Sequence, residues 1–398
     1  MKVFIKGLNS CGMRKADVQR YRDFLVENEH EVVNRPQDAE VLLLWTCAFR
    51  RDFRDNSISE IKRYTKEFDG ELIVCGCLPD IDRDILKKNF SGRFISWRND
   101  QKGMEEYFGA PNKKLSEINR TLSEKSLCND VEKYRKDNPL KDASFIDRFN
   151  KLFVTEGCNF ECSYCSERLA FPPYRSFPEE DLVKACRDMV EQTGKLEVML
   201  LGDSIGDYGC DTGSNLPALI HKLKGIDPEL KVALQGLNPA SIIRFYNEMK
   251  EFLLHGDIRH LQIPIQSASD RILKLMNRPY TRDDLDNVFG LLRSVNFTEF
   301  DTHLIIGFPG EKEEDLEQTL EFVLNYRPKY VLASGYMESP AMQASGLKDK
   351  VNDQVKYRRL RYAESQIKAA GILCNTDDSE LSADRCRRLN LTYIPIMD

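Results

Sequence analysis

The sequence lacks several features that would place the protein in a familiar class. No apolar run approaches the roughly 20 residues of a membrane-spanning helix, and the N-terminus lacks the cleavage site of a signal peptide. There is no internal repeat of fixed period and no low-complexity tract. The five histidines form neither an H-x3-H nor an H-E-x-x-H metal pattern. We therefore expect a cytoplasmic protein with no membrane partner.

Length and charge narrow the class further. The chain has 398 residues, 41% hydrophobic and 31% charged, which suits two or three folded domains. Fifty-eight Lys and Arg against 64 Asp and Glu give a net charge of −6. Residues 152–398 alone carry 29 basic and 38 acidic groups, a net charge of −9. This sign disfavours a protein that holds nucleic acid over a broad face, because phosphate contacts need Lys and Arg.

Short apolar runs alternate with helical patterns along most of the chain, which predicts α/β domains with parallel sheets. Residues 1–109 predict an open parallel-sheet α/β domain, with strands at 3–8, 41–45, 72–76 and 94–97 and helices at about 14–28, 52–67 and 80–89. Residues 110–150 are polar and indicate a linker. Residues 151–371 predict a partial (β/α)6 barrel, with strands at 152–156, 197–202, 230–234, 260–265, 300–308 and 330–334. Residues 372–398 remain as a short tail, which has room for one strand.

Twelve cysteines are the most informative feature, because thiols in a reducing compartment are more often metal ligands than disulfides. Cys158, Cys162 and Cys165 have C-x3-C-x2-C spacing directly after a predicted strand. Three thiolates this close can converge on one centre, either an iron–sulfur cluster or zinc. Zinc would need a fourth protein ligand, and no histidine lies between His30 and His221. The pattern therefore favours iron and sulfur.

This spacing, with the aromatic Tyr164 before the last cysteine, resembles the signature of the radical S-adenosylmethionine (SAM) superfamily. The resemblance implies a 4Fe–4S cluster on Cys158, Cys162 and Cys165 whose open iron binds the amino and carboxylate groups of SAM. It implies that SAM is cleaved to methionine and a 5′-deoxyadenosyl radical. It also implies a partial (β/α)6 barrel, in agreement with the alternation of strands and helices.

Three later segments resemble one branch of that superfamily, the methylthiotransferases: LLGDSIGDYGCD (200–211), IPIQSASDRILKLMNRPYTRDD (263–284) and LIIGFPGEKEEDLEQTL (304–320). The resemblance places a turn of the last segment beside the adenine of SAM, and glycine there lets backbone approach a ligand closely. Side chains of the middle segment would face the ribose and carboxylate of SAM, and an arginine fork suits a carboxylate. Asp203 stands at a strand end where these enzymes commonly have Gln. The predicted SAM contacts are Tyr164, Asp203, Gln266, Ser267, Arg278, Gly307, Pro309 and Gly310.

A second set of cysteines follows the predicted strands of the N-terminal domain. Cys11, Cys47 and Cys77 follow the first, second and third strands, at the sheet edge where open α/β folds build their sites. Their contexts, LNSCGMRKADVQ, LLWTCAFRRD and IVCGCLPD, resemble the methylthiotransferase N-terminal domain, which implies an auxiliary 4Fe–4S cluster. Cys75 lies within the predicted strand at 72–76, whereas Cys77 follows the end of that strand. We leave it out of the set.

The sequence therefore predicts a radical SAM methylthiotransferase that converts an unactivated C–H bond into C–S–CH3. The resemblance implies two 4Fe–4S clusters, SAM as methyl donor and radical source, an electron donor such as flavodoxin or ferredoxin, and a sulfide or sulfur donor. The tail is too short for the TRAM domain of tRNA- and ribosomal-protein-modifying members, and with the acidic charge this favours a peptide or protein side chain as substrate. The alternatives are a tRNA adenosine, sulfur insertion without methylation, and a non-catalytic iron–sulfur sensor or scaffold. The roles of Cys374 and Cys386 stay open.

Overall fold

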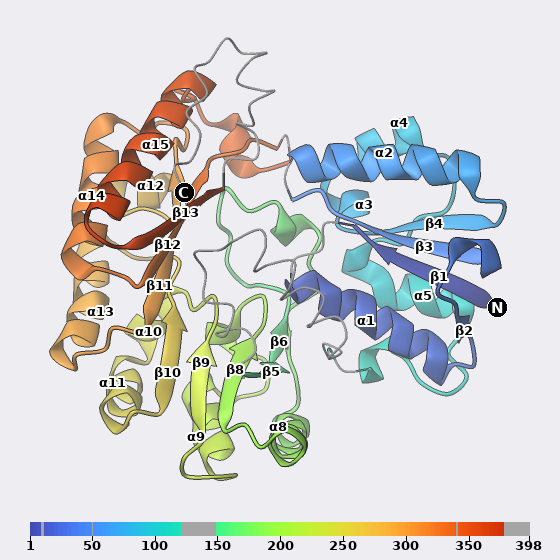
Figure 1. Ribbon diagram of the computed structural model, residues 1–398, viewed down its shortest axis with the longest axis horizontal. Coiled ribbons are helices and arrows are strands. Elements are labelled where there is room, and N and C mark those ends of the chain that lie inside the picture. The colour runs from blue at the N-terminus through green and yellow to red at the C-terminus, as the bar shows by residue number, and fades with distance from the viewer. Residues whose placement is uncertain (9–11, 50, 119, 121–148, 340, 378–398) are drawn as a thin grey trace. The chain divides into compact units, whose positions relative to one another are not determined.

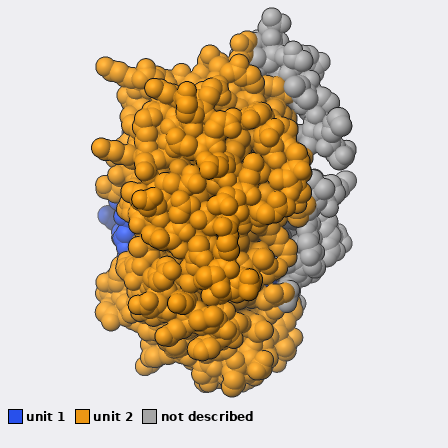
Figure 2. All heavy atoms as spheres, turned by 90° about the vertical axis from the view of Figure 1, so that its left-hand side faces the viewer, with its two compact units in different colours: residues 1–159, 165–178, 201–203 blue, residues 160–164, 179–200, 204–398 orange. Residues whose placement is uncertain are grey.

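The computed structural model describes residues 1–8, 12–49, 51–118, 120, 149–339 and 341–377. The chain divides into two compact units that interleave in sequence. Unit 1 comprises residues 1–159, 165–178 and 201–203, and unit 2 comprises residues 160–164, 179–200 and 204–398 (Figure 2). Of the predicted radical SAM triad, Cys162 belongs to unit 2, whereas Cys158 and Cys165 belong to unit 1.

Unit 1 contains a parallel sheet with the strand order β2-β1-β3-β4. Its strands are β1 (Lys2–Gly7), β2 (Glu31–Val32), β3 (Val41–Thr46) and β4 (Glu71–Gly76). Every residue of β3 is buried. A strand in the interior of a parallel sheet is covered on both faces, and this is why the VLLLW segment is continuously apolar rather than alternating.

Helices cover both faces of this sheet, and α1 and α2 lie on opposite sides of it (Figure 1). The α-helices of unit 1 are α1 (Gly12–Glu27), α2 (Arg51–Glu67), α3 (Leu78–Ile81), α4 (Arg83–Asn89) and α5 (Asp100–Phe108). Its shorter elements are the 3-10 turns η1 (Pro36–Asp38), η2 (Trp97–Asn99), η3 (Leu115–Glu117) and η4 (Glu167–Leu169), and the strands β5 (Asn150–Phe153), β6 (Thr155–Glu156) and β7 (Arg175–Ser176).

In unit 2, parallel strands run in the order β13-β12-β11-β10-β9-β8. They are β8 (Glu197–Leu201), β9 (Lys231–Leu234), β10 (Ile258–Gln262), β11 (Phe300–Ile306), β12 (Tyr330–Gly335) and β13 (Leu373–Asp377). Helices α13, α14 and α15 lie along the same side of strands β10 to β12 (Figure 1). The predicted α/β fold with parallel sheets is confirmed.

The helices of unit 2 fall between these strands: α8 (Glu179–Thr193), α9 (Leu216–Lys224), α10 (Pro239–Arg244), α11 (Tyr246–His255), α12 (Asp270–Leu275), α13 (Arg282–Ser294), α14 (Glu313–Tyr326) and α15 (Asp353–Ala369), with the 3-10 turns η5 (Ile205–Asp207) and η6 (Gln343–Gly346). Local signals set their starts. Thr281 caps α13, for example, by accepting from the backbone N–H of Asp284 while the Asp284 carboxylate accepts from that of Thr281. Within the described part of the chain, no helix is long and apolar enough to cross a membrane.

The structure differs from the sequence prediction at residues 94–97 and agrees with it in the tail. The predicted strand at 94–97 is wrong: Phe94 makes only an isolated bridge to Val74, and the chain then turns into η2. The tail does supply a strand, because β13 pairs with β12. Most of the predicted linker, residues 121–148, and the rest of the tail lie outside the described residues.

Candidate functional site

In unit 1, two of the three cysteines predicted for an auxiliary cluster hydrogen-bond to each other. Cys47 directly follows β3 and Cys77 directly follows β4, and these strands are neighbours in the sheet. Both thiols are buried. The hydrogen bond from Cys77 is the main cause that lowers the pKa of Cys47, and the backbone of Phe49 and the cation of Arg14 contribute in the same direction. Cys11 lies outside the described residues.

Backbone and hydroxyl contacts hold these two thiols at the strand ends. Gly76 has φ of 89°, and a Cβ there would lie 2.4 Å from the carbonyl oxygen of Thr46, so glycine is required immediately before Cys77. The N–H of Cys77 donates to that same oxygen at 3.0 Å. The hydroxyl of Ser57 donates to the carbonyl of Cys47 (2.9 Å) and accepts from its N–H (3.1 Å). Paired thiols in such a frame fit the thiolate ligands of an iron–sulfur cluster.

A buried ion network lies at the start of α1. Nη1 of Arg14 lies 3.0 Å from Oδ2 of Asp17, and Nη2 of Arg14 pairs with Asp203. Arg120 reaches the same two carboxylates, at 2.6 Å from Oδ1 of Asp17 and 3.5 Å from Oδ2 of Asp203. None of the four side chains is more than 3% exposed. Burial alone would raise the pKa of Asp17, but the charges of Arg120 and Arg14 lower it below its usual value.

This network engages the carboxylate that the sequence predicts to contact SAM or substrate. Besides the guanidinium groups, Asp203 accepts a hydrogen bond at 3.0 Å from the N–H of Gly157, the residue before Cys158. In the structure Asp203 thus fixes the start of the cysteine loop relative to α1. The arginines were missed from the sequence: Arg14 and Asp17 have i,i+3 helical spacing, but nothing local signals that they are buried.

In unit 2, Arg278 lies beside the second cysteine of the triad. Its Nη1 donates to Sγ of Cys162 and to the hydroxyl of Tyr164, both at 3.3 Å. Its Nη2 donates to the carbonyl of Pro264 (2.9 Å), and its Nε donates to the hydroxyl of Tyr280 (2.6 Å). Burial works against the charge, but Tyr164, Tyr280 and Cys162 raise the pKa of Arg278 well above its usual value. The predicted contact to the SAM carboxylate stays a prediction, whereas the contact to sulfur is observed.

Gln266 and Ser267, also predicted to face SAM, follow β10. Gln266 has φ of 67°, a left-handed conformation that is rare for a side chain of this kind and clusters at functional sites, and it forms an isolated bridge to Leu304 of β11. The buried hydroxyl of Ser267 lies 3.2 Å from Oγ1 of Thr319 and accepts from the N–H of Ser269 at 3.2 Å. Ser267 therefore helps to start α12, and Gln266 keeps the more open position.

The turn predicted to lie beside adenine follows β11 and contains Gly307, Pro309 and Gly310. Both glycines have positive φ, 74° and 84°. The N–H of Gly307 donates to Oε1 of the buried Glu311 (2.9 Å), which also accepts from Nη1 of Arg359 (3.1 Å). Burial raises the pKa of Glu311 to about 7. This carboxylate, which sequence reasoning missed, closes the turn from within.

A hydrophobic cluster of unit 2 joins this turn to the cysteine loop. Phe308 of the turn is buried in it with Ile272 and Met276, and Tyr164 packs against the cluster. Unit 2 thus brings together the turn at 307–310 and the loop that carries Cys162.

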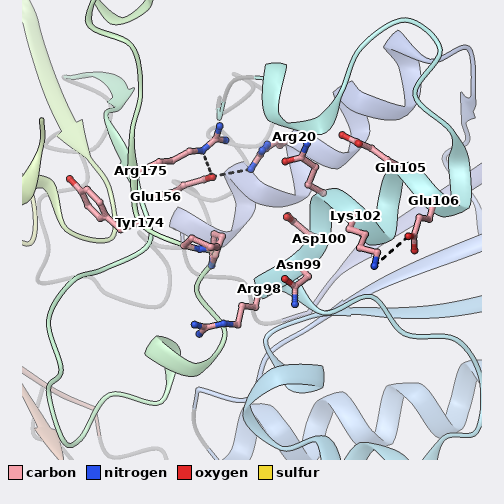
Figure 3. Close-up of a pocket in the computed structure, with 13 residues that line it drawn as sticks. Arg20, Arg98, Asn99, Asp100, Lys102, Glu105, Glu106, Glu156, Tyr174 and Arg175 are labelled. Carbon is pink, nitrogen blue, oxygen red and sulfur yellow. Dashed lines mark hydrogen bonds and ion pairs between the residues drawn. The ribbon is translucent and has the colours of Figure 1, made fainter. Parts of the chain in front are cut away.

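Unit 1 also holds a cavity of about 710 Å³ that no motif predicts. Figure 3 shows the carboxylate of Glu156 between the guanidinium groups of Arg20 and Arg175, with an Arg20 Nη1–Glu156 Oε2 distance of 3.0 Å. Burial raises the pKa of Asp100, at the start of α5, to about 7. Charges of both signs line the cavity: Arg20, Arg98, Asn99, Asp100, Gln101, Lys102, Glu105, Glu106, Glu156, Pro172, Pro173, Tyr174 and Arg175.

The described residues contain no group of three His, Cys, Asp or Glu side chains placed to hold a metal ion. The assignment of both triads therefore rests on donor type and position. In unit 1, paired thiols lie at adjacent strand ends, and in unit 2 the Cys162 sulfur accepts from a cation, which suits a thiolate bound to iron. The residues fit the two clusters in this chemical sense.

Comparison with known proteins agrees with both halves of this picture. Residues 152–323 match the Radical SAM superfamily, and residues 2–95 match the Uncharacterized protein family UPF0004. In the solved structures, the chain resembles the radical S-adenosylmethionine methyltransferase TsrM from Kitasatospora setae, with a TM-score of 0.61, 12% identity, and coverage of 86% of this chain and 77% of that chain. It also resembles the cobalamin-dependent S-adenosylmethionine radical enzyme OxsB, with a TM-score of 0.56, 11% identity, and coverage of 99% and 62%. These likenesses show the fold.

Curated relatives extend over nearly the whole chain. The ribosomal protein uS12 methylthiotransferase RimO of Thermotoga maritima is 29% identical over 371 residues, which cover 90% of this chain and 81% of that protein. The probable threonylcarbamoyladenosine tRNA methylthiotransferase of Methanocaldococcus jannaschii is 27% identical over 370 residues, with the same coverage of 90% and 81%. Enzymes of this type carry two 4Fe–4S clusters and use SAM. With both domain families and these relatives in agreement, the chain belongs to the radical SAM methylthiotransferases.

Proposed function

We propose that this methylthiotransferase replaces an unactivated C–H bond by C–S–CH3 on a protein side chain. The hydrogen-bonded pair of Cys47 and Cys77 carries the proposal, because a second cysteine set at a sheet edge is what the transfer of a sulfur-containing group adds to radical SAM chemistry. The relatives modify either a tRNA or a ribosomal protein, so they do not choose between these substrates.

We assign the ligands as the sequence predicts them. Cys158, Cys162 and Cys165 hold the radical SAM cluster, and Cys11, Cys47 and Cys77 hold the auxiliary cluster. When bound, the two clusters and SAM supply the electron, the radical and the methyl group. The protein's own contribution is to exclude water and to hold these loops in place.

Several residues of the chain perform this holding. In unit 1, Gly76 and Ser57 fix the backbone around the paired thiols, and Asp203 ties Gly157 to Arg14. In unit 2, the turn at 307–310 is closed by Glu311, and its positive-φ glycines leave backbone accessible where the resemblance places adenine.

Charge supports the choice of a protein over tRNA. Residues 152–398 have a net charge of −9, which opposes contact with a phosphate backbone. Binding of bulk tRNA should be measured by filter retention at 50 and 200 mM salt. We expect weak binding throughout; tight binding that falls about 1,000-fold or more between these concentrations is the behaviour of several phosphate contacts and would assign the tRNA substrate instead.

Iron content tests the two-cluster assignment. After anaerobic reconstitution we expect about eight irons per chain, and about four in the Cys47→Ala/Cys77→Ala variant, because each cubane holds four. Cys75→Ala is the matched control. This thiol is equally buried on β4, two residues before Cys77, and packs in the hydrophobic core, so its loss should leave about eight irons. Equal iron in all three proteins would remove the auxiliary site and with it the proposed reaction.

Product mass separates the remaining functions. The protein and tRNA fractions of cells that express the wild-type chain are compared with those of cells that express Cys158→Ala. A gain of one CH2S unit on a peptide supports methylthiolation of a protein. A gain of sulfur alone would indicate insertion without methylation, and no new product together with no SAM cleavage would indicate a sensor or scaffold.

A further inference from the structure

Among the residues that the structure describes, Arg278 is a half-buried cation without an acidic partner. Its guanidinium donates to one sulfur, two phenol oxygens and one carbonyl, and no carboxylate in the described part of the chain forms an ion pair with it. A cation withdrawn from water in this way is costly unless an anion lies close by. The sulfur of Cys162, once it is a thiolate, is that anion.

The contact between Arg278 and Cys162 is held by the backbone on both sides. Within unit 2, the N–H of Ser163 donates to the carbonyl of Met276 (3.0 Å), and its hydroxyl donates to that of Leu275 (2.8 Å). The amide of Asn277 donates to the carbonyl of Glu161 (2.8 Å). The cysteine loop at 161–164 is thus fastened to the segment that leads into Arg278. These contacts hold the side chains of Arg278 and Cys162 close together.

Tyr280 orients the arginine from the other side. Its hydroxyl accepts from Nε of Arg278 at 2.6 Å and donates to the carbonyl of Ile265 at 3.1 Å. With Pro264 accepting from Nη2, only Nη1 points toward the sulfur and toward Tyr164. The fork is therefore fixed in a plane before any cofactor binds.

We propose that Arg278 tunes the cluster ligated by Cys162, raising its reduction potential through an N–H···S hydrogen bond and its positive charge. The inference rests on the proposed assignment of Cys162 as a ligand. Hydrogen bonds to cluster sulfurs and nearby charge both set the potential of an iron–sulfur centre. A cation stabilises the reduced, more negative form, so reduction becomes easier. Arg278 is a positioning and tuning residue for electron uptake by this cluster.

The test is a redox titration followed by electron paramagnetic resonance, without SAM. All variants are made in the Cys47→Ala/Cys77→Ala background so that one cluster gives the signal. Arg278→Met should lower the reduced-to-oxidised ratio at a fixed potential about tenfold, a shift of about 59 mV for a one-electron couple. Arg282→Met is the matched control, since Arg282 lies four residues on and pairs with Asp286 at 3.0 Å rather than with sulfur. It should titrate like the background.

Two milder variants keep the test decisive if Arg278→Met fails to hold iron. Arg278→Lys keeps the charge but loses the fork, and Tyr280→Phe removes the acceptor that orients it; both should shift the ratio in the same direction by less. An unchanged ratio in the variants that do hold iron overturns the inference, even if SAM then binds more weakly, because that result assigns Arg278 to the SAM carboxylate alone. A background protein that still carries about eight irons refutes the proposed function instead, so the two failures are distinguishable.

Discussion

Each unit contains an arginine whose charge acts on a predicted cluster cysteine, and the two arginines are paired in opposite ways. In unit 1, Arg14 lies in an ion network with Asp17 and Asp203, and its Cζ lies 4.1 Å from the centroid of the Trp97 ring. In unit 2, Arg278 contacts sulfur, phenol and carbonyl groups. Within the described residues, the first cation is neutralised by protein carboxylates and the second is not.

This difference separates a structural role from an electronic one. A buried cation that is already paired holds its partners in place, and removing one partner leaves an uncompensated charge. Arg278, which pairs with no carboxylate among the described residues, can act on the sulfur of Cys162. We therefore assign Arg14 to joining segments of unit 1, and we propose that Arg278 tunes a cysteine ligand in unit 2.

The largest loss of stability is expected when the paired arginine of unit 1 loses one of its carboxylate partners. Asp203→Asn removes a carboxylate from Arg14 and Arg120, so unit 1 should lose about 3 to 5 kcal/mol of unfolding free energy, as for other broken buried pairs. Urea unfolding of the apoprotein can be followed by tryptophan fluorescence, which reports on unit 1 because Trp45 and Trp97 both lie there.

Asp69→Asn is the control for the same change of charge, since Asp69 is exposed and should matter by less than about 0.5 kcal/mol. If Asp203→Asn is as mild as this control, the network does not hold unit 1 together and the contrast between the two arginines disappears.

The parts of the fold that could be predicted from the sequence are those set by local patterns. The run VLLLW and the helical pattern after it are enough to predict β3 and α2 within a few residues. Because parallel strands end at one sheet edge, the cysteines after them could be expected together, and Cys47 and Cys77 are neighbours. Resemblance supplied the assignment to clusters, which geometry alone leaves open.

The buried charges could not be predicted because their partners are distant in sequence. Arg14 and Asp203 are 189 positions apart. Because charged side chains are rarely buried, the sequence pattern predicts both at the surface. The false strand at 94–97 has a similar cause. Asp80 accepts from the hydroxyl of Ser96 and from the N–H of Arg98 (3.2 Å), which bends the chain into η2 despite its β-forming residues.

Asp100 is a buried acid in unit 1, and the nearby cation Arg20 does not offset the cost of burying its negative charge. Burial raises its pKa from 3.8 to about 7, even though Arg20 acts to lower it. Between about pH 4 and 7 the folded protein then binds more protons than the unfolded chain, so stability falls as the pH rises. Over about three pH units this amounts to at most about 4 kcal/mol.

Asp100→Asn cannot lose the proton and should escape this penalty. Relative to the wild type, it should gain stability on going from pH 4 to pH 8, as measured by urea unfolding with tryptophan fluorescence at both values. A wild-type-to-variant difference that is the same at both pH values would show that Asp100 is ionised throughout, and that unit 1 does pair its acid.

The smallest loss of stability is expected at Gly157, whose backbone N–H donates to Asp203. Gly157 has φ of 75°, and a Cβ there would lie 2.6 Å from the carbonyl oxygen of Pro172. Gly157→Ala should therefore cost about 2 to 3 kcal/mol, from left-handed strain plus a contact that only backbone movement relieves. Gly109→Ala isolates the strain, because Gly109 has φ of 78° but its nearest contact would be Cδ of Pro111 at 3.8 Å, so about 1 kcal/mol is expected. Both are measured by urea unfolding with tryptophan fluorescence. Equal losses would mean that the loop before Cys158 can shift without cost, and that the network around Asp203 does not fix it.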